Sequence, residues 1–107
     1  MLRIYDDALA AVRAIGPLAE AIEGRDRDLA RQLRRSCSSM VLNLAEGGGH
    51  RAGTRRQRYF DALGSARETL ANLECSEALG YIGPVDEALR ARFRAVIGTL
   101  VVCTRRR

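Results

Sequence analysis

The chain has 107 residues, a length that fits one domain with one hydrophobic core. Hydrophobic residues make up 47% of it and charged residues 29%, which excludes a disordered or low-complexity protein. All 18 basic residues are arginine, and against 13 acids they give a net charge of +5. The absence of lysine reflects either coding bias or bidentate contacts to phosphate, which arginine makes and lysine does not.

The first two predicted helices follow from apolar residues that recur every three or four positions. The first covers residues 5–22, and Gly16-Pro17 predicts a kink or short break in it, because proline lacks a backbone N–H. The second covers residues 28–46, and Asp26 or Asp28 can cap its start. Gly47 is expected to end this helix in the left-handed conformation. Their apolar faces comprise Tyr5, Ala8, Val12, Ile15, Ala19 and Ile22, then Leu29, Leu33, Cys37, Met40, Val41 and Leu44.

The third and fourth helices are predicted in the same way. Thr54 begins a capping box, so the third helix is expected over residues 54–79. The fourth is expected to start with Pro84 as its first residue, and residues 101–103 make its end apolar nearly all round. Their apolar faces comprise Tyr59 or Phe60 with Leu63, Ala66, Leu70 and Leu73, then Val85, Leu89, Phe93, Val96, Ile97 and Leu100.

Four amphipathic helices with short connections predict an all-α protein, an antiparallel up-down-up-down four-helix bundle that forms one domain over residues 1–107. The apolar end of the fourth helix exceeds what a small monomer would cover. It therefore indicates self-association, or else an irregular tail that leaves the helix.

The compartment follows from two further features. Residues 1–10 contain no signal-peptide core, and the longest strongly apolar stretch, residues 96–103, is too short to span a bilayer. We therefore expect a cytoplasmic protein with no membrane partner. Cys37, Cys75 and Cys103 form no CxxC pair and lie in apolar helical contexts, so we expect buried small hydrophobes, with a disulfide or a metal site as the less favoured alternative.

Polar residues recur on one face of the second helix, beside the apolar stripe. Because the second and third helices should lie antiparallel, these residues can meet polar residues of the third helix. We expect a structural network, with no catalytic role, of Ser39, Asn43, Glu46, Ser65 and Glu68. No histidine or metal-ligand spacing accompanies the two glutamates, so an enzyme is the weakest hypothesis, and no cofactor or metal is expected.

Gly64 and the glycine-rich segment 47–53 have separate explanations. Glycine inside a helix costs about 1 kcal/mol relative to alanine, so Gly64 is expected to mark a close approach of two helices. The segment 47–53 is not a nucleotide-binding loop, because Thr54 follows it where a lysine is required and a helix, not a strand, precedes it.

Positive charge is concentrated in residues 31–58, where seven arginines face Glu46 alone, a net charge of +6. Arg55 and Arg56 are expected in the first turn of the third helix, where the helix dipole disfavours cations. A bound anion would reverse that cost. Either a nucleic-acid surface or a solvated basic loop explains this pattern. In the first case binding is to the phosphate backbone and sensitive to salt. The candidate nucleic-acid-binding residues are Arg35, Arg51, Arg55, Arg56 and Arg58.

Two segments, QLRRSCSSMVLNLAEGGGHR (residues 32–51) and FDALGSARETLANLECSEALGYI (residues 60–82), carry a family resemblance. The chain resembles the four-helix-bundle family encoded by intervening sequences in bacterial 23S ribosomal RNA genes. The resemblance implies a left-handed bundle and ring-like homo-oligomers, with pentamers known in the family. It also implies kinship with accessory proteins of diversity-generating retroelements, which bind nucleic acid through a basic surface and work with a reverse transcriptase. The matching positions are Arg34, Arg35, Ser36, Ser39, Asn43 to Gly47, Gly64, Ser65 and Glu68.

Two functions are therefore considered. The first is a non-catalytic homo-oligomeric bundle that binds RNA or DNA non-specifically through its arginines. The alternative is a scaffold for protein–protein interaction, with a reverse transcriptase or another protein as partner and no role for nucleic acid.

Overall fold

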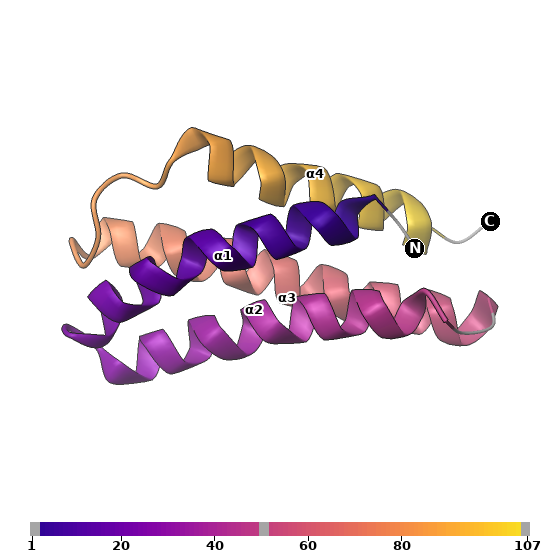
Figure 1. The fold of residues 1–107 in the computed structure, drawn as a ribbon, viewed down its shortest axis with the longest axis horizontal. Coiled ribbons are helices and arrows are strands. Elements are labelled where there is room, and N and C mark those ends of the chain that lie inside the picture. The colour runs from indigo at the N-terminus through magenta and orange to yellow at the C-terminus, as the bar shows by residue number, and fades with distance from the viewer. Residues whose placement is uncertain (1–2, 50–51, 106–107) are drawn as a thin grey trace.

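The computed structural model describes residues 3–49 and 52–105, which form an all-helical bundle (Figure 1). The four helices are α1 (Ile4–Glu23), α2 (Arg27–Gly47), α3 (Ala52–Ala78) and α4 (Glu87–Thr104). Successive helices run in opposite directions, and the molecule measures 42 × 23 × 21 Å. The predicted all-α class and antiparallel bundle are confirmed.

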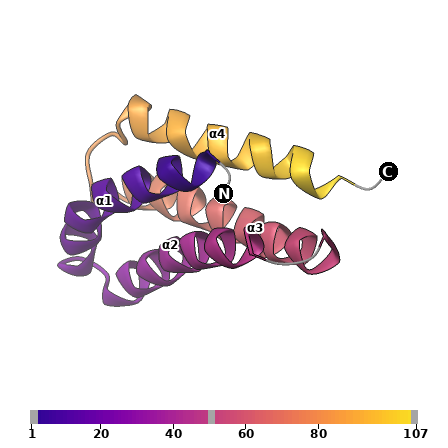
Figure 2. The ribbon, with the colours of Figure 1, turned by 45° about the vertical axis from the view of Figure 1, so that its right-hand side comes forward.

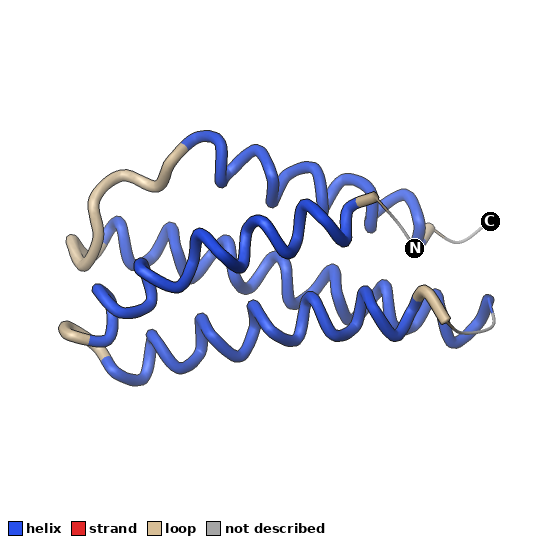
Figure 3. Tube along the Cα trace, viewed as in Figure 1, coloured by secondary structure: helices blue, strands red, loops and turns tan. Residues whose placement is uncertain are grey.

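Each helix packs against its neighbours in sequence, and α1 also packs against α4, which closes the bundle (Figures 1 and 2). The contact between α2 and α3 is the most extensive of these pairs. The end of α2, the start of α3 and the end of α4 lie at one end of the molecule (Figure 3). The α1–α2 and α3–α4 connections lie at the opposite end.

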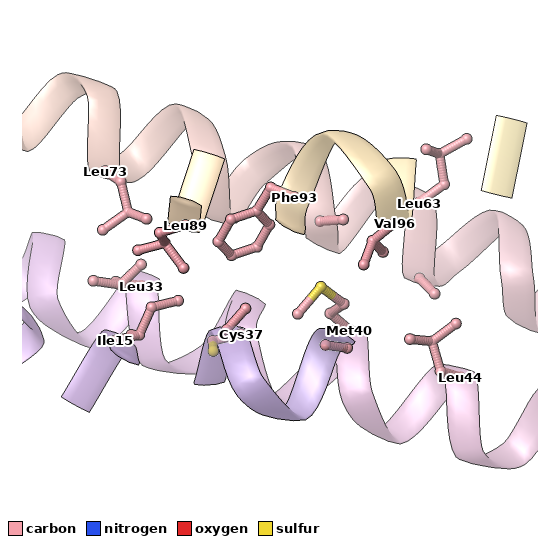
Figure 4. Close-up of a cluster of buried hydrophobic side chains, with 14 of the residues drawn as sticks. Ile15, Leu33, Cys37, Met40, Leu44, Leu63, Leu73, Leu89, Phe93 and Val96 are labelled. Atoms are coloured by element: carbon pink, nitrogen blue, oxygen red, sulfur yellow. The ribbon is translucent and has the colours of Figure 1, made fainter. Parts of the chain in front are cut away.

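The core lies along the axis of the bundle and receives side chains from all four helices (Figure 4). Of the two aromatic alternatives on α3, Tyr59 is buried with 6% of its surface exposed, whereas Phe60 is 56% exposed. Fully enclosed side chains include Ile22, Leu33, Met40, Leu73, Phe93, Val96 and Leu100.

The limits of α1 and α2 differ partly from the prediction. α1 continues without a break through Pro17, so the predicted break is wrong. Asp26 is the N-cap of α2, since its side chain accepts a hydrogen bond of 2.9 Å from the backbone N–H of Leu29. Gly47 is still helical and Gly48 has a φ of −64°, so the expected left-handed end is also wrong.

The starts of α3 and α4 also require correction. α3 already includes Ala52, so Thr54 lies inside the helix and is not its N-cap. Pro84 lies three residues before the first residue of α4, because Asp86 is the N-cap of that helix. The α3–α4 connection contains Gly80, whose φ of 77° is the only positive value in the described part of the chain. Its lack of a Cβ makes that conformation accessible.

Gly47 and Gly64 have different structural roles from those expected. A Cβ on Gly47 would lie 2.6 Å from Cδ1 of Tyr59, so glycine is required there for close packing of α2 on this aromatic ring. A Cβ on Gly64 would meet no atom within 4 Å, so the predicted close approach at Gly64 is wrong.

The three cysteines are all free, and they differ in exposure. Cys37 is buried, and burial raises the pKa of its thiol to about 11. Cys75 and Cys103 are exposed, so the prediction of burial is wrong for these two. Within the described residues, no helix is both long enough and apolar enough to cross a membrane.

Candidate nucleic-acid interface

Arg58 lies where the end of α2 faces the start of α3, and it is occupied by its neighbours. Its Nε lies 3.1 Å from Oε2 of Glu46, and its Nη1 lies 3.5 Å from Oδ1 of Asn43, to which it donates. Arg58 therefore already has an anionic partner and a hydrogen-bond acceptor on α2, although both side chains of the ion pair remain partly exposed. The sequence pattern gave no sign of this pair, because Arg58 and Glu46 lie on different helices.

Arg56 has a structural role at the same end of the molecule. Its Nη2 donates a 2.7 Å hydrogen bond to the backbone carbonyl oxygen of Thr104, the last residue of α4. The final carbonyl groups of a helix have no partner within the helix and carry partial negative charge, so a guanidinium group stabilises them. Arg56 therefore links the start of α3 to the end of α4.

The structure describes four of the five candidate arginines, because Arg51 lies outside the described residues. Arg55 is exposed near the start of α3. Arg35 lies on α2, twelve residues before Gly47, which corresponds to about 18 Å along the helix. Arg35 and Arg58 nevertheless line one hollow between α2 and α3, together with Asn43 and Glu46.

Ser39, Asn43 and Ser65 lie together between α2 and α3. The hydroxyl of Ser65 donates to that of Ser39 at 2.9 Å, and Nδ2 of Asn43 donates to the backbone oxygen of Ser39, also at 2.9 Å. Glu46 joins this group through Arg58. Of the five residues expected in the polar network, Glu68 alone lies outside this chain of hydrogen bonds, on the wall of an adjacent hollow.

The same helix pair contains polar contacts that the sequence analysis did not include in the network. The hydroxyl of Thr69 donates to that of Ser36 at 2.8 Å, and Nδ2 of Asn72 donates to the carbonyl of Leu29 at 3.1 Å. Ser65, Thr69 and Asn72 are spaced four and three apart, so they share one face of α3. That spacing was the signal in the sequence from which these contacts could have been predicted. The contacts fix the register of the two helices.

A hollow on the described surface lies beside the N-terminal half of α2 and has a volume of about 700 Å³. Four of its seven lining residues are arginines, and we call it the α2 arginine hollow. Three of these four arginines were not among the predicted site residues. The lining consists of Glu23, Arg27, Asp28, Arg31, Arg34, Arg35 and Ser38.

Two ion pairs cross the α2 arginine hollow. Arg31 pairs with Asp28, and Arg34 of α2 pairs with Glu23 of α1. The hydrogen bond from Arg31, helped by a second one from Gln32, lowers the pKa of Asp28 below its usual value. All four paired side chains remain exposed, and exposed pairs of this kind contribute only about 0–1 kcal/mol each.

The arginines of α4 contrast with those of α2. Each is paired with a carboxylate, so this side of the molecule offers little free positive charge. On α2, by contrast, Arg27 and Arg35 have no ion-pair partner in the described part of the chain. The α4 pairs are Arg90 with Glu74 at 2.7 Å and Glu77 at 3.0 Å, Arg92 with Asp7 at 3.1 Å, and Arg94 with Glu87 at 2.6 Å.

The described residues contain no arrangement of side chains that would support metal binding or acid–base catalysis. No group of three or more histidine, cysteine or acidic side chains is placed there to hold a metal ion. Glu46 is held by Arg58, and Glu68 shares its hollow with Arg35 and polar side chains. The arginine-bearing surface can bind anions through its guanidinium groups.

Comparison with known proteins identifies the family. The crystal structure of a protein of unknown function from Bacteroides thetaiotaomicron, of the S23 ribosomal protein family, is similar with a TM-score of 0.80 and 22% identity. The alignment covers 96% of this chain and 99% of that one, which shows a shared fold. No curated protein matches. The family model for 23S rRNA-intervening sequence proteins matches residues 1–99, so the chain belongs to this family.

Proposed function

We propose that this protein is a non-catalytic, cytoplasmic, self-associating bundle that binds RNA or DNA without sequence specificity. The observation that carries the proposal is the uneven distribution of charge. Residues 31–58 carry +6, and Arg35 has no ion-pair partner in the described part of the chain, whereas each arginine of α4 has one. A nucleic acid carries a regular row of phosphates, and guanidinium groups bind phosphate in bidentate geometry.

Self-association is supported by apolar surface at the end of α4. Val102 is 59% exposed and Cys103 is exposed, although both belong to a regular helix. The family resemblance adds homo-oligomers, with a pentamer as the expected form. An oligomer repeats each basic surface once per subunit, and linked sites of this kind bind a polymer more tightly than one site does.

The second candidate function is a scaffold that binds another protein, such as a reverse transcriptase. Leu42 on α2 is 62% exposed and Phe60 on α3 is 56% exposed, and large apolar side chains on a surface favour contact with a protein. Capture of partners from native lysate, with and without nuclease treatment, separates the two functions. Partners that survive nuclease support the scaffold, whereas partners lost with nuclease support nucleic-acid binding.

The direct experiment titrates labelled single- and double-stranded nucleic acid with the purified protein at low and at moderate salt. Binding at low salt that weakens as salt rises is expected, because counterions are released from the phosphates. The triple variant Arg35→Glu, Arg51→Glu and Arg55→Glu should bind more weakly, and it leaves Arg56 in place because that residue holds the end of α4. Absence of binding by the unmodified protein at low salt would overturn the proposal.

A further inference from the structure

We propose that the α2 arginine hollow is the principal phosphate-binding site of this protein and that its ligand is the backbone of a nucleic-acid duplex. The inference rests on the proposed function and locates it on residues outside the α2–α3 end. At that end, Arg58 pairs with Glu46 and donates to Asn43, and Arg56 donates to the carboxyl end of α4. The hollow is lined by four arginines, of which the sequence analysis had named only Arg35.

Three of these arginines form a row along α2. Arg27, Arg31 and Arg35 are four residues apart, so they lie on the same side of the helix, with successive Cα atoms about 6 Å apart along its axis. All three are exposed. Long side chains in such a row can reach successive phosphates of one strand.

The charge balance of the hollow favours an anion. Four guanidinium groups face two carboxylates, a net charge of +2. In the described part of the chain, neither Arg27 nor Arg35 has an ion-pair partner. Arg27 is also the first residue of α2, where the helix dipole disfavours a cation, and a bound phosphate would remove that cost.

The two carboxylates of the hollow act as competitors of the ligand. Asp28 holds Arg31, and Glu23 holds Arg34, in exposed pairs that a phosphate can replace. Since each arginine keeps an anionic partner in either state, exchange of carboxylate for phosphate costs little. Removal of these two carboxylates should therefore strengthen binding more than removal of two acids elsewhere on the surface. If the ligand were held only by the net charge of the protein, the position of the removed acids would not matter.

The chemistry of the lining favours a duplex over a single strand. None of the seven lining residues is aromatic, so the hollow offers no platform on which unpaired bases could stack. A duplex carries twice the phosphate charge per unit length of one strand, which strengthens binding that depends on charge alone. The predicted order of affinity is duplex above single strand of equal length.

The first test compares two charge-matched variants by fluorescence anisotropy of a labelled duplex. The hollow variant carries Arg27→Gln, Arg31→Gln and Arg35→Gln, which leaves the ion pair of Arg34 in place. The control carries the same change at Arg13, Arg67 and Arg94, which are exposed on α1, α3 and α4. Both variants have a net charge of +2, three below the +5 of the natural chain. Circular dichroism melting establishes that each is folded.

The hollow variant should bind at least about tenfold more weakly at low salt, and its log–log salt slope should be smaller by about three, one unit per lost phosphate contact. The control should stay within about threefold of the unmodified protein, because none of its three arginines lines the hollow. Equal weakening of the two variants would overturn the proposal and assign the effect to net charge.

The second test remains informative if the hollow variant does not fold. Glu23→Gln with Asp28→Asn is compared with Asp61→Asn and Glu87→Gln, exposed acids elsewhere. Both pairs raise the net charge by two, to +7. The first pair should tighten duplex binding several-fold more than the second. Equal tightening would contradict the proposal.

The failure of this inference can be distinguished from failure of the proposed function. If the unmodified protein binds a duplex and the hollow variant binds equally well, the hollow is not the site, while nucleic-acid binding stands. If the unmodified protein binds no nucleic acid at low salt, the proposed function itself is overturned.

Discussion

Replacing Gly47 with alanine tests the packing of α2 on α3 at a single atom. The added Cβ would lie 2.6 Å from Cδ1 of Tyr59, closer than carbon atoms can approach without movement. Tyr59 is only 6% exposed, so its ring must shift into packed surroundings or leave the core.

The magnitude follows from two opposing terms. Alanine is favoured over glycine in a helix by about 1 kcal/mol, which would stabilise the protein. Overpacking a core costs about 1–3 kcal/mol, and expelling a large apolar side chain costs about 1.5–3 kcal/mol. Because burial of Tyr59 is lost or strained, we expect net destabilisation of about 1–2 kcal/mol.

The assay is urea unfolding followed by circular dichroism, at a fixed protein concentration so that self-association does not differ between samples. The double variant Gly47→Ala with Tyr59→Leu removes the ring that the Cβ meets, so the cost of the alanine should largely disappear in that background. Unchanged or increased stability of Gly47→Ala alone would refute the reasoning.

Three further predictions concern single sites. Gly64→Ala should raise the free energy of unfolding by about 0.5–1 kcal/mol, because a Cβ there meets no atom and alanine favours the helix; a loss of stability in urea unfolding would contradict this. Arg56→Ala should lower the free energy of unfolding by about 1 kcal/mol through loss of the hydrogen bond to Thr104. Arg13→Ala is an exposed control that should change it little, and an equal effect of the two variants would count against the structural role of Arg56. In thiol titration near neutral pH two cysteines should react fast and Cys37 only on unfolding, whereas three fast thiols would contradict its burial. Because the pKa of Cys37 is raised from 9.0 to about 11 in the folded protein, its contribution to stability is present below pH 9 and should be lost as pH rises from 9 through 11.

The fold was predictable because its signals are local. A repeat of apolar residues every three or four positions, such as Leu33, Cys37, Met40 and Leu44, requires only that one side of a helix faces a core. The first residues of the helices were harder to predict. Pro84 and Thr54 are both good starting residues by composition, but α4 starts three residues after Pro84 and α3 includes residues before Thr54.

The candidate site was less predictable because it depends on which helices face each other. A count of charge along the chain cannot reveal that Glu46 neutralises Arg58, or that Arg56 reaches the end of α4 across forty-eight residues. The same count left Arg27 outside the basic segment 31–58, although Arg27 shares a hollow with Arg35. Only the spacing of four residues along α2 connects these two arginines in the sequence.

The measurement that tests the central claim most directly is purification of the protein without nuclease, followed by light scattering and the ratio of absorbance at 260 and 280 nm. The account predicts a particle several times the 11.8 kDa of one chain, with absorbance from co-purified nucleic acid that is lost after nuclease treatment or a high-salt wash. A particle of one chain with the absorbance of protein alone, even when prepared at low salt, would contradict it.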